Sequence, residues 1–283
     1  MLVVDHGYGL RLIRQADHAA LSGDIAFAWR APRALPESYW PSFIEAVRHH
    51  DDGWETEDAL PALSNGRPLD FKETPVARHV AVWRRSIDLA GARDVYQEII
   101  VGNHARWLYM RFPRGDSGED RKVAESFVEE TRRRIDSRAE TLRARGGDAR
   151  AAAEPAALEA ARKLLSFFDA LSLALLGGLP FFSRSEPLPL ADEEAALHLT
   201  QTAARDPGSD APGGAAVAPW PFVPGRVELR SRAFDLGARS FASPADCAAA
   251  MAAIRPSSIG FVLDPWRRDL SFPPGETGKP RVT

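Results

Sequence analysis

The chain has 283 residues, of which 45% are hydrophobic and 27% charged, ordinary globular values that exclude wholesale disorder, collagen and coiled-coil rods. Its 36 basic and 39 acidic residues leave a net charge of −3, which gives no general electrostatic reason to bind nucleic acid or anionic lipid. The single cysteine, Cys247, excludes an internal disulfide framework and a cysteine-rich zinc site.

The sequence has no feature typical of a membrane or secreted protein. Its most apolar run, Leu164 to Leu176, is interrupted by polar residues and is shorter than the roughly 20 residues that cross a bilayer. The N-terminus lacks the basic start and apolar stretch of a secretory signal. We therefore expect a cytoplasmic location and a small-molecule partner, with neither nucleic acid nor membrane as partner. A homodimer is left open.

In chain order, residues 1–15 are expected to form a β-hairpin around a turn at 7–9. Prolines, capping residues and helical spacing of apolar side chains then predict helices over 17–29, 41–50, 75–87 and 94–112, with a long loop at 55–75. A charged helix is expected over 119–145, because its acids and bases alternate as on a solvent-facing surface. The next helix, 156–176, becomes apolar all round, which is typical of a buried helix.

The character of the sequence changes after residue 176. Prolines, glycines and small residues predict a loop-rich segment over 177–226, and alternating residues predict strands within a C-terminal β segment at 227–265. Residues 266–283 are expected as a flexible tail. The whole chain, 1–283, is thus predicted as one mainly α domain. Its helical metal-binding core, 16–176, would carry a small sheet formed by the N-terminal hairpin and the C-terminal strands.

The predicted helices carry ionisable residues in a suggestive order. His18, the adjacent pair His50-Asp51, then His79, His104 and Asp169 place one ligand group on each of five helices. Imidazole and carboxylate groups suit iron, manganese, zinc and similar divalent ions. Six such groups that converge could hold two ions about 3.5–4 Å apart, the spacing of two-metal sites. The sequence therefore predicts a metal site, with iron or manganese favoured.

Asp169 gives the strongest single argument for this site. It stands between Phe168 and Ala170 in the apolar helix, and a buried carboxylate is costly unless it is paired or binds a metal. The alternative is an aspartate bonded to a serine or arginine from elsewhere. A lone histidine on a helix is likewise more often packed or exposed than a ligand. The order of the groups, and not any one residue, carries the prediction, and His6, His49 and His198 receive no role.

The tetrapeptide His50-Asp51-Asp52-Gly53 resembles the His-Asp-x-Gly turn of the HD superfamily, whose members are helical and depend on metals. The glycine would let the helix end in a left-handed turn. In the two-metal branch of that superfamily the ligands follow the order found here. The resemblance therefore implies an HD-like helical core in which His18, His50, Asp51, His79, His104 and Asp169 bind two metals.

The wider chain is similar to the bacterial family of unknown function numbered 3891. The similarity rests on His50 to Trp54, on Gly66-Arg-Pro-Leu-Asp-Phe71 and on Pro219-Trp-Pro-Phe222, and it covers most of residues 1–265. This family implies no reaction. HD members often have a lysine after the glycine, where this chain has Trp54, and that lysine commonly contacts substrate phosphate.

Two enzymatic functions fit the same metal set. A phosphohydrolase acting on a small phosphorylated substrate would use both metals to stabilise developing charge, with Arg84 and Arg106 as candidate phosphate ligands and Asp52 as a general base or an orienting group. A di-iron oxygenase that cleaves a C–C or C–P bond is the alternative. A third hypothesis is a non-catalytic binding module with a degenerate site. Hydrolysis is favoured because it is the commoner activity of the superfamily.

Overall fold

The computed structural model describes residues 1–5, 9–115, 117–178, 181–203 and 212–267. Three predictions fall outside these residues: the turn at residues 7 and 8, any role for His6, and nearly all of the tail expected at 266–283. Among the described residues, none of the helices combines the length and the apolarity that crossing a bilayer requires.

The helices follow the predicted order closely through the first two thirds of the chain. They are α1 (Gln15–Ala28), α2 (Trp40–Arg48), α3 (Glu55–Ala59), α4 (Val76–Arg93), α5 (Val95–Arg111), α6 (Gly118–Arg143), α7 (Gly147–Ala152) and α8 (Pro155–Leu176); α9 (Pro244–Ala252) follows between strands of the C-terminal segment. The stretch expected as a loop at 55–75 holds α3 and the short hairpin of β3 (Leu63–Ser64) and β4 (Arg67–Pro68).

Several helix ends follow directly from the residues found there. Ser117 caps α6 by accepting a hydrogen bond from the backbone N–H of Asp120. Between α6 and α7, Gly146 and Gly147 both have positive φ angles, a conformation in which glycine avoids the strain that a Cβ would cause. Pro155 opens α8, where its missing N–H costs nothing.

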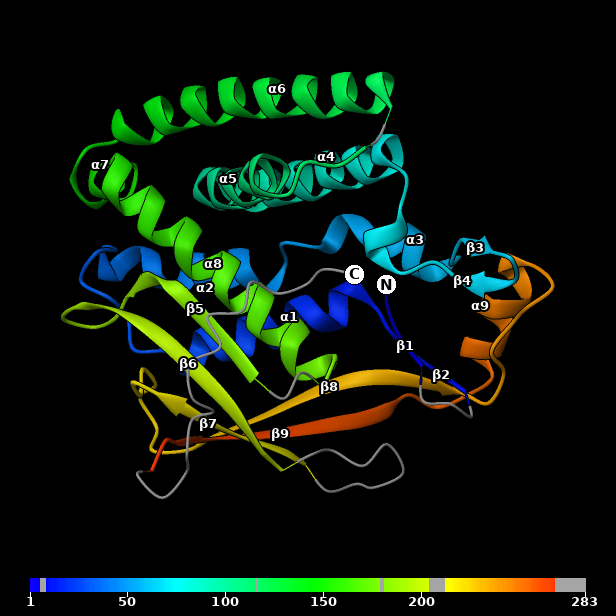
Figure 1. Ribbon diagram of the computed structural model, residues 1–283. Helices are drawn as coiled ribbons and strands as arrows, with labels where there is room; N and C mark the ends of the chain where they lie inside the picture. Colours follow the sequence, from blue (N-terminus) through cyan, green and yellow to red (C-terminus); the bar gives the residue numbers. More distant parts are fainter. Residues whose placement is uncertain (6–8, 116, 179–180, 204–211, 268–283) are drawn as a thin grey trace.

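The prediction of a mainly α, HD-like fold with a small sheet is wrong. One seven-stranded, curled mixed sheet spans the molecule in the order β1-β2-β8-β9-β7-β6-β5 (Figure 1). Its strands are β1 (Leu2–Asp5), β2 (Leu10–Ile13), β5 (Phe181–Pro189), β6 (Glu194–Ala203), β7 (Gly213–Ala218), β8 (Val227–Leu236) and β9 (Ser257–Pro265). The N-terminal hairpin is confirmed by the antiparallel pairing of β1 with β2.

The difference comes from the segment 177–226, which was expected to be loop-rich and instead contributes three strands. β5 contains two prolines and a register shift between Arg184 and Leu188, and β7 has the sequence Gly-Gly-Ala-Ala-Val-Ala. Neither sequence shows the alternation that usually indicates a strand, and the two together contain one β-branched residue, Val217. β7 instead gains its strand conformation from its neighbours, β6 on one side and, in parallel, β9 on the other.

The helices lie in layers above this sheet. α1 packs on β8 and α8 packs on β5, so these two helices are next to the sheet, and α5 packs between α8 and α6. Figure 1 shows α6 farthest from the sheet, across the top of α4 and α5. One large core fills these layers, and within it Trp29, directly after α1, contacts Phe167 and Phe168 of α8. This packing brings α1, α5 and α8 together with the end of α2.

Candidate metal centre

Five of the six predicted metal ligands meet in the interior. His18 lies on α1, His104 on α5 and Asp169 on α8, while His50 and Asp51 follow the end of α2. The side chains of the three histidines are 1% exposed, that of Asp51 is 7% exposed and that of Asp169 is 14% exposed. The cluster is therefore almost dry, and Asp169 is the member that solvent reaches most.

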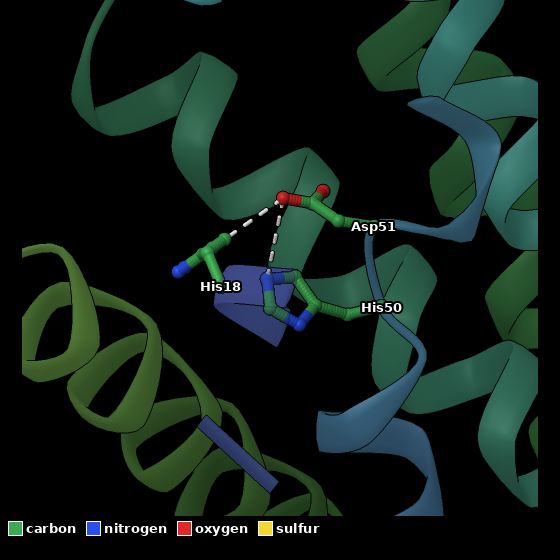
Figure 2. A group of neighbouring side chains, drawn as sticks. All are labelled: His18, His50 and Asp51. Carbon is green, nitrogen blue, oxygen red and sulfur yellow. Dashed lines mark ion pairs between the residues drawn. The ribbon is translucent and has the colours of Figure 1, made fainter. Parts of the chain in front are cut away.

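The imidazole Nε2 atoms of this cluster converge on the two carboxylates. Nε2 of His18 lies 3.5 Å from Oδ2 of Asp51 and 3.2 Å from Oδ1 of Asp169. Nε2 of His50 lies 3.6 Å from Oδ2 of Asp51, and Figure 2 shows both histidines directed at that oxygen. Nε2 of His104 lies 3.3 Å from Oδ2 of Asp169. The ligand atoms of His18, His50 and Asp51 lie within 4.8 Å of one another, as do those of His50, His104 and Asp169.

The other ring nitrogen of each histidine is held from outside the cluster. Nδ1 of His50 lies 2.7 Å from the carbonyl oxygen of Val47, so this nitrogen must be the donor. Nδ1 of His18 lies 2.6 Å from Oγ of Ser172 and Nδ1 of His104 lies 3.2 Å from Oγ of Ser166. Outward hydrogen bonds of this kind fix the ring orientation and the tautomer of metal-binding histidines.

The tautomer of His18 follows from the protons of its neighbour. Ser172 donates its single hydroxyl proton to the carbonyl oxygen of Asp169 at 2.8 Å, so its oxygen accepts from His18 Nδ1. With a proton on Nδ1, the neutral ring of His18 presents a lone pair at Nε2, toward the carboxylates. His50 does the same because its Nδ1 donates to a carbonyl. Both rings are thus oriented as ligands.

Electrostatics couple the histidines to the aspartates. Burial alone would lower the pKa of His50, but the carboxylates of Asp51 and Asp169 outweigh burial and raise this pKa to about 9. The pKa of His18 also rises, since hydrogen bonds to the same two carboxylates outweigh its burial. Conversely, burial would raise the pKa of Asp51 and of Asp169, but their histidine partners hold both pKa values below the usual range. The carboxylates therefore favour the protonated form of both histidines, and the histidines favour the ionised form of both carboxylates.

Two buried atoms of the cluster have no hydrogen-bond partner: Nε2 of His104 and Oδ1 of Asp51. Burial lowers the pKa of His104 despite its contact with Asp169, which keeps its ring neutral. A buried polar atom without a partner costs free energy, and coordination to a cation would remove that cost. The donor atoms, their burial and these two unpartnered atoms fit a divalent transition metal.

Gly53 fixes the position of the His50-Asp51 pair by a mechanism different from the expected one. It is not among the glycines with positive φ, so the prediction of a left-handed turn is wrong. Instead, a Cβ at this position would lie 2.3 Å from the carbonyl oxygen of Val82 on α4. The Gly53 N–H also donates to Oγ of Ser86. Glycine is needed here because the turn packs directly on the backbone of α4.

The sixth predicted ligand, His79 on α4, lies beside the cluster and outside both triads. Its Nδ1 is 2.7 Å from the hydroxyl of Tyr109, and the ring packs between Trp54 and Trp83. Trp83 also contacts the ring of His104. Burial and then the positive charge of Arg114 lower the pKa of His79 to about 3. His79 is therefore neutral. It belongs to neither triad, and the nitrogen that contacts Tyr109 is Nδ1, not Nε2.

The three residues predicted as catalytic point elsewhere. Asp52 pairs with Arg93 and with Nδ1 of His49, on the outside of the turn. Arg84 is exposed and pairs with Glu130 of α6 at 2.6 Å. Arg106 lines a groove on the outer face of α5, opposite His104. Long arginine side chains near a ligand in sequence do not share its helix face unless they are three or four residues away.

The two histidines without a predicted role also lie outside the cluster. His49 pairs with Asp52, and His198 of β6 bonds Ser183 of β5.

Four residues around the cluster were not predicted from the sequence to have a role there: Ser166, Ser172, Tyr109 and Arg114. The two serines had a usable signal, because each lies three residues from Asp169 and therefore on the same face of α8. Arg114 donates to the carbonyl oxygens of Phe71 and Lys72, and its Nη1 is buried without a partner. No local pattern marks it, because it follows the end of α5.

A family model described as protein of unknown function (DUF3891) matches residues 1–237, so the chain belongs to this family. This match agrees with the sequence resemblance to the family of that number. The resemblance to the HD superfamily is not confirmed by it. No curated protein and no solved structure matches the chain.

Proposed function

We propose that this member of the family is a metal-dependent hydrolase that acts on a small phosphorylated substrate. The observation that carries the proposal is the orientation of His18, His50 and His104. Their Nδ1 atoms are bonded outward and their Nε2 atoms face two buried carboxylates. Structural histidines in a core need no common direction, whereas metal ligands do.

The donors divide naturally between two ions. His18, His50, Asp51 Oδ2 and Asp169 Oδ1 would hold the first. His104, Asp169 and Asp51, whose Oδ1 is unpartnered, would hold the second. His50 belongs to both groups of ligand atoms, and its single inward nitrogen would bind one ion only. Each carboxylate has a second oxygen that would be available to the other ion.

Divalent ions in such a site supply Lewis acidity and a nucleophile for hydrolysis at neutral pH. The chain itself must supply a cation for the substrate phosphate. We assign this role to Arg114, whose charge lowers the pKa of His79 and whose Nη1 is buried without a partner. Trp54 and Trp83 pack around His79 and exclude water from this side of the cluster.

The di-iron oxygenase is a second candidate, because three imidazoles with two carboxylates form an all-nitrogen and oxygen set that also suits iron. A distant relationship to the two-metal branch of the HD superfamily would be consistent with either function, since the order of the ligands along the chain is the same. The structure offers Tyr109 next to His79, whereas the partly buried charge of Arg114 favours a phosphate substrate over oxygen.

Turnover tests the proposal. We would assay bis(p-nitrophenyl) phosphate and p-nitrophenyl phosphate with Mn²⁺ or anaerobic Fe²⁺, comparing the wild type with Asp51→Asn. Hydrolysis that falls by more than about 100-fold in this variant supports the proposal, since it removes a proposed bridging ligand. Asp136→Asn, an exposed aspartate of α6, is the matched control and should keep full activity.

Arg114→Gln separates substrate binding from metal binding. It should raise KM for the phosphate esters while leaving the metal content unchanged. Metal-loaded protein that hydrolyses neither ester but shows the EPR signal of a mixed-valent iron pair would transfer the assignment to the oxygenase. Protein that binds no metal would support the binding module instead.

A further inference from the structure

A groove of about 590 Å³ lies between α5, α6 and α8, and His104 is not among its lining residues. Its volume falls within the range of small-molecule sites, roughly 300–1,000 Å³. One stripe from each helix lines it: Asn103, Arg106, Trp107 and Met110 from α5, Ile135, Asp136, Ala139, Glu140 and Arg143 from α6, and Pro155, Leu158, Glu159 and Arg162 from α8. None of the five metal-cluster residues is among them.

Arg162 is the polar anchor of this groove. Its side chain is only 9% exposed and its guanidinium stacks on the ring of Trp107, with Cζ 4.9 Å from the ring centroid. Nε and Nη2 donate to Glu159, and Nη2 also donates to Glu186. Nη1 is buried and has no partner. A charged N–H in this position is costly unless an acceptor reaches it.

Arg106 of α5 also has a buried guanidinium nitrogen without a partner. This atom is Nε, and Arg106 makes no ion pair with any residue that the structure describes. Arg143, at the end of α6, donates to the carbonyl oxygen of Ala153 and likewise has no carboxylate partner among the described residues. The groove thus offers two guanidinium groups whose charges are not neutralised by the chain.

The lining carboxylates offset these charges only in part. Asp136 is paired with Arg132 at 2.7 Å, and Glu159 is paired with Arg162 at 2.6 Å. Glu140 is the remaining lining carboxylate, and it is exposed to solvent. After internal pairing, an anion between Arg106 and Arg143 is therefore favoured over a cation.

Apolar surface borders the same arginines. The side chain of Met110 is 56% exposed, and Trp107 packs edge-on against Phe112, which is 48% exposed. Leu158 and Ile135 lie at the other walls. Large apolar side chains exposed beside unpaired arginines are typical of a site for an amphiphilic ligand.

We propose that this groove binds a small organic anion, a carboxylate or phosphate with an apolar body. The anionic group would be held between Arg106 and Arg143, with Nη1 of Arg162 beneath it, and the apolar body would lie on Trp107 and Met110. The site is separate from the metal centre and does not depend on its function. It shares α5 and α8 with the metal centre, because Arg162 stands one turn before Ser166.

The fluorescent probe 8-anilinonaphthalene-1-sulfonate, an aromatic anion, tests this site on the full chain. The wild type should bind it saturably. Arg106→Gln and Arg143→Gln should each raise the Kd about tenfold, the effect of losing one charge-assisted hydrogen bond. Met110→Ser should weaken binding without changing the charge. Arg84→Gln is the control, a more exposed arginine that is paired outside the groove, and its Kd should match the wild type.

Circular dichroism melts identify any variant that fails to fold, and the solvent-exposed Met110→Ser then keeps the test decisive. Octyl phosphate should displace the probe at far lower concentration than inorganic phosphate. Equal potency of the two would overturn the apolar part of the proposal. Absence of saturable binding, or unchanged binding in both arginine variants, would overturn the site itself. Metal content should be unchanged in all these variants, so failure here does not bear on the proposed hydrolase.

Discussion

The candidate metal cluster and the outer face of α6 both consist of ionisable side chains in contact, but those of the cluster are buried and those of α6 are exposed. On α6, Glu129 pairs with both Arg132 and Arg133 at 2.9 and 2.8 Å, and every partner is exposed. In the cluster, His18 and Asp51 are buried, and Oδ1 of Asp51 has no partner. Charges that satisfy one another at the surface serve solubility, whereas buried charges with unpartnered atoms indicate a ligand.

The largest expected effect comes from the carboxylates of the cluster. Asp51→Asn or Asp169→Asn should weaken metal binding by more than about 100-fold, beyond what loss of an outer partner costs, because each removes an anionic ligand. Isothermal titration of chelator-treated protein with Mn²⁺ measures this. Unchanged affinity in Asp169→Asn would show that Asp169 is not a ligand. Burial and unpartnered atoms would then not distinguish the cluster from the ion pairs of α6 as a metal site.

The next effect is on the stability of the metal-free protein as a function of pH. The pKa of His50 is about 9 in the folded protein and about 6.5 in the unfolded chain, so the folded state binds more protons between these values. This contribution is fully present below pH 6.5 and is lost as pH rises through 9. It amounts to a decrease on the order of 3 kcal/mol in the free energy of unfolding.

Urea unfolding at pH 6 and pH 9, in the presence of a chelator, measures this decrease. His50→Gln should remove most of the difference between the two pH values, because glutamine does not titrate. A wild-type protein equally stable at both pH values would show that the carboxylates do not hold a proton on His50.

The serines that orient the imidazoles should have a smaller effect. Ser172→Ala and Ser166→Ala should weaken metal binding by roughly 10–100-fold, as outer partners of metal ligands typically do. Ser137→Ala, on the exposed part of α6, is the control. If both cluster variants bind metal like the control, the outward hydrogen bonds do not select the ligand geometry.

The smallest effect is expected at the surface pairs. Glu129→Gln should change the free energy of unfolding by less than about 1 kcal/mol, because exposed ion pairs contribute little. Asp52→Asn should leave metal content unchanged, since Asp52 pairs with Arg93 and His49 outside the cluster. A loss of metal in Asp52→Asn would restore the orienting role that the sequence predicted as one of two alternatives for it.

The sequence was sufficient to predict the helices that hold the site and to nominate the five residues that meet there. Helical periodicity is a local pattern, so the helices could be predicted from it. The side chains of His18, His50, Asp51, His104 and Asp169 meet in the interior because each lies on or directly after a helix that packs inward. His79 also faces inward, but its ring is turned to Tyr109, a contact that spacing along the chain cannot reveal.

The sheet was not predictable in the same way. β7 is made mostly of small residues and becomes a strand only between β6, which precedes it along the chain, and β9, which is distant in sequence. Strand formation there depends on non-local pairing, whereas the pattern used for prediction is local. The prediction that Arg84 and Arg106 bind phosphate beside the metals meets a related difficulty. Proximity in sequence to His79 or His104 does not fix the direction of a side chain, and both arginines point away from the cluster.

Metal content tests the central claim most directly. Protein reconstituted anaerobically with iron or manganese, freed of loosely bound ions and measured by elemental analysis should retain about two equivalents, and His104→Gln should retain about one, since ligated metal is bound tightly enough to survive this treatment. A wild-type protein that retains under about one equivalent of any transition metal would contradict the account.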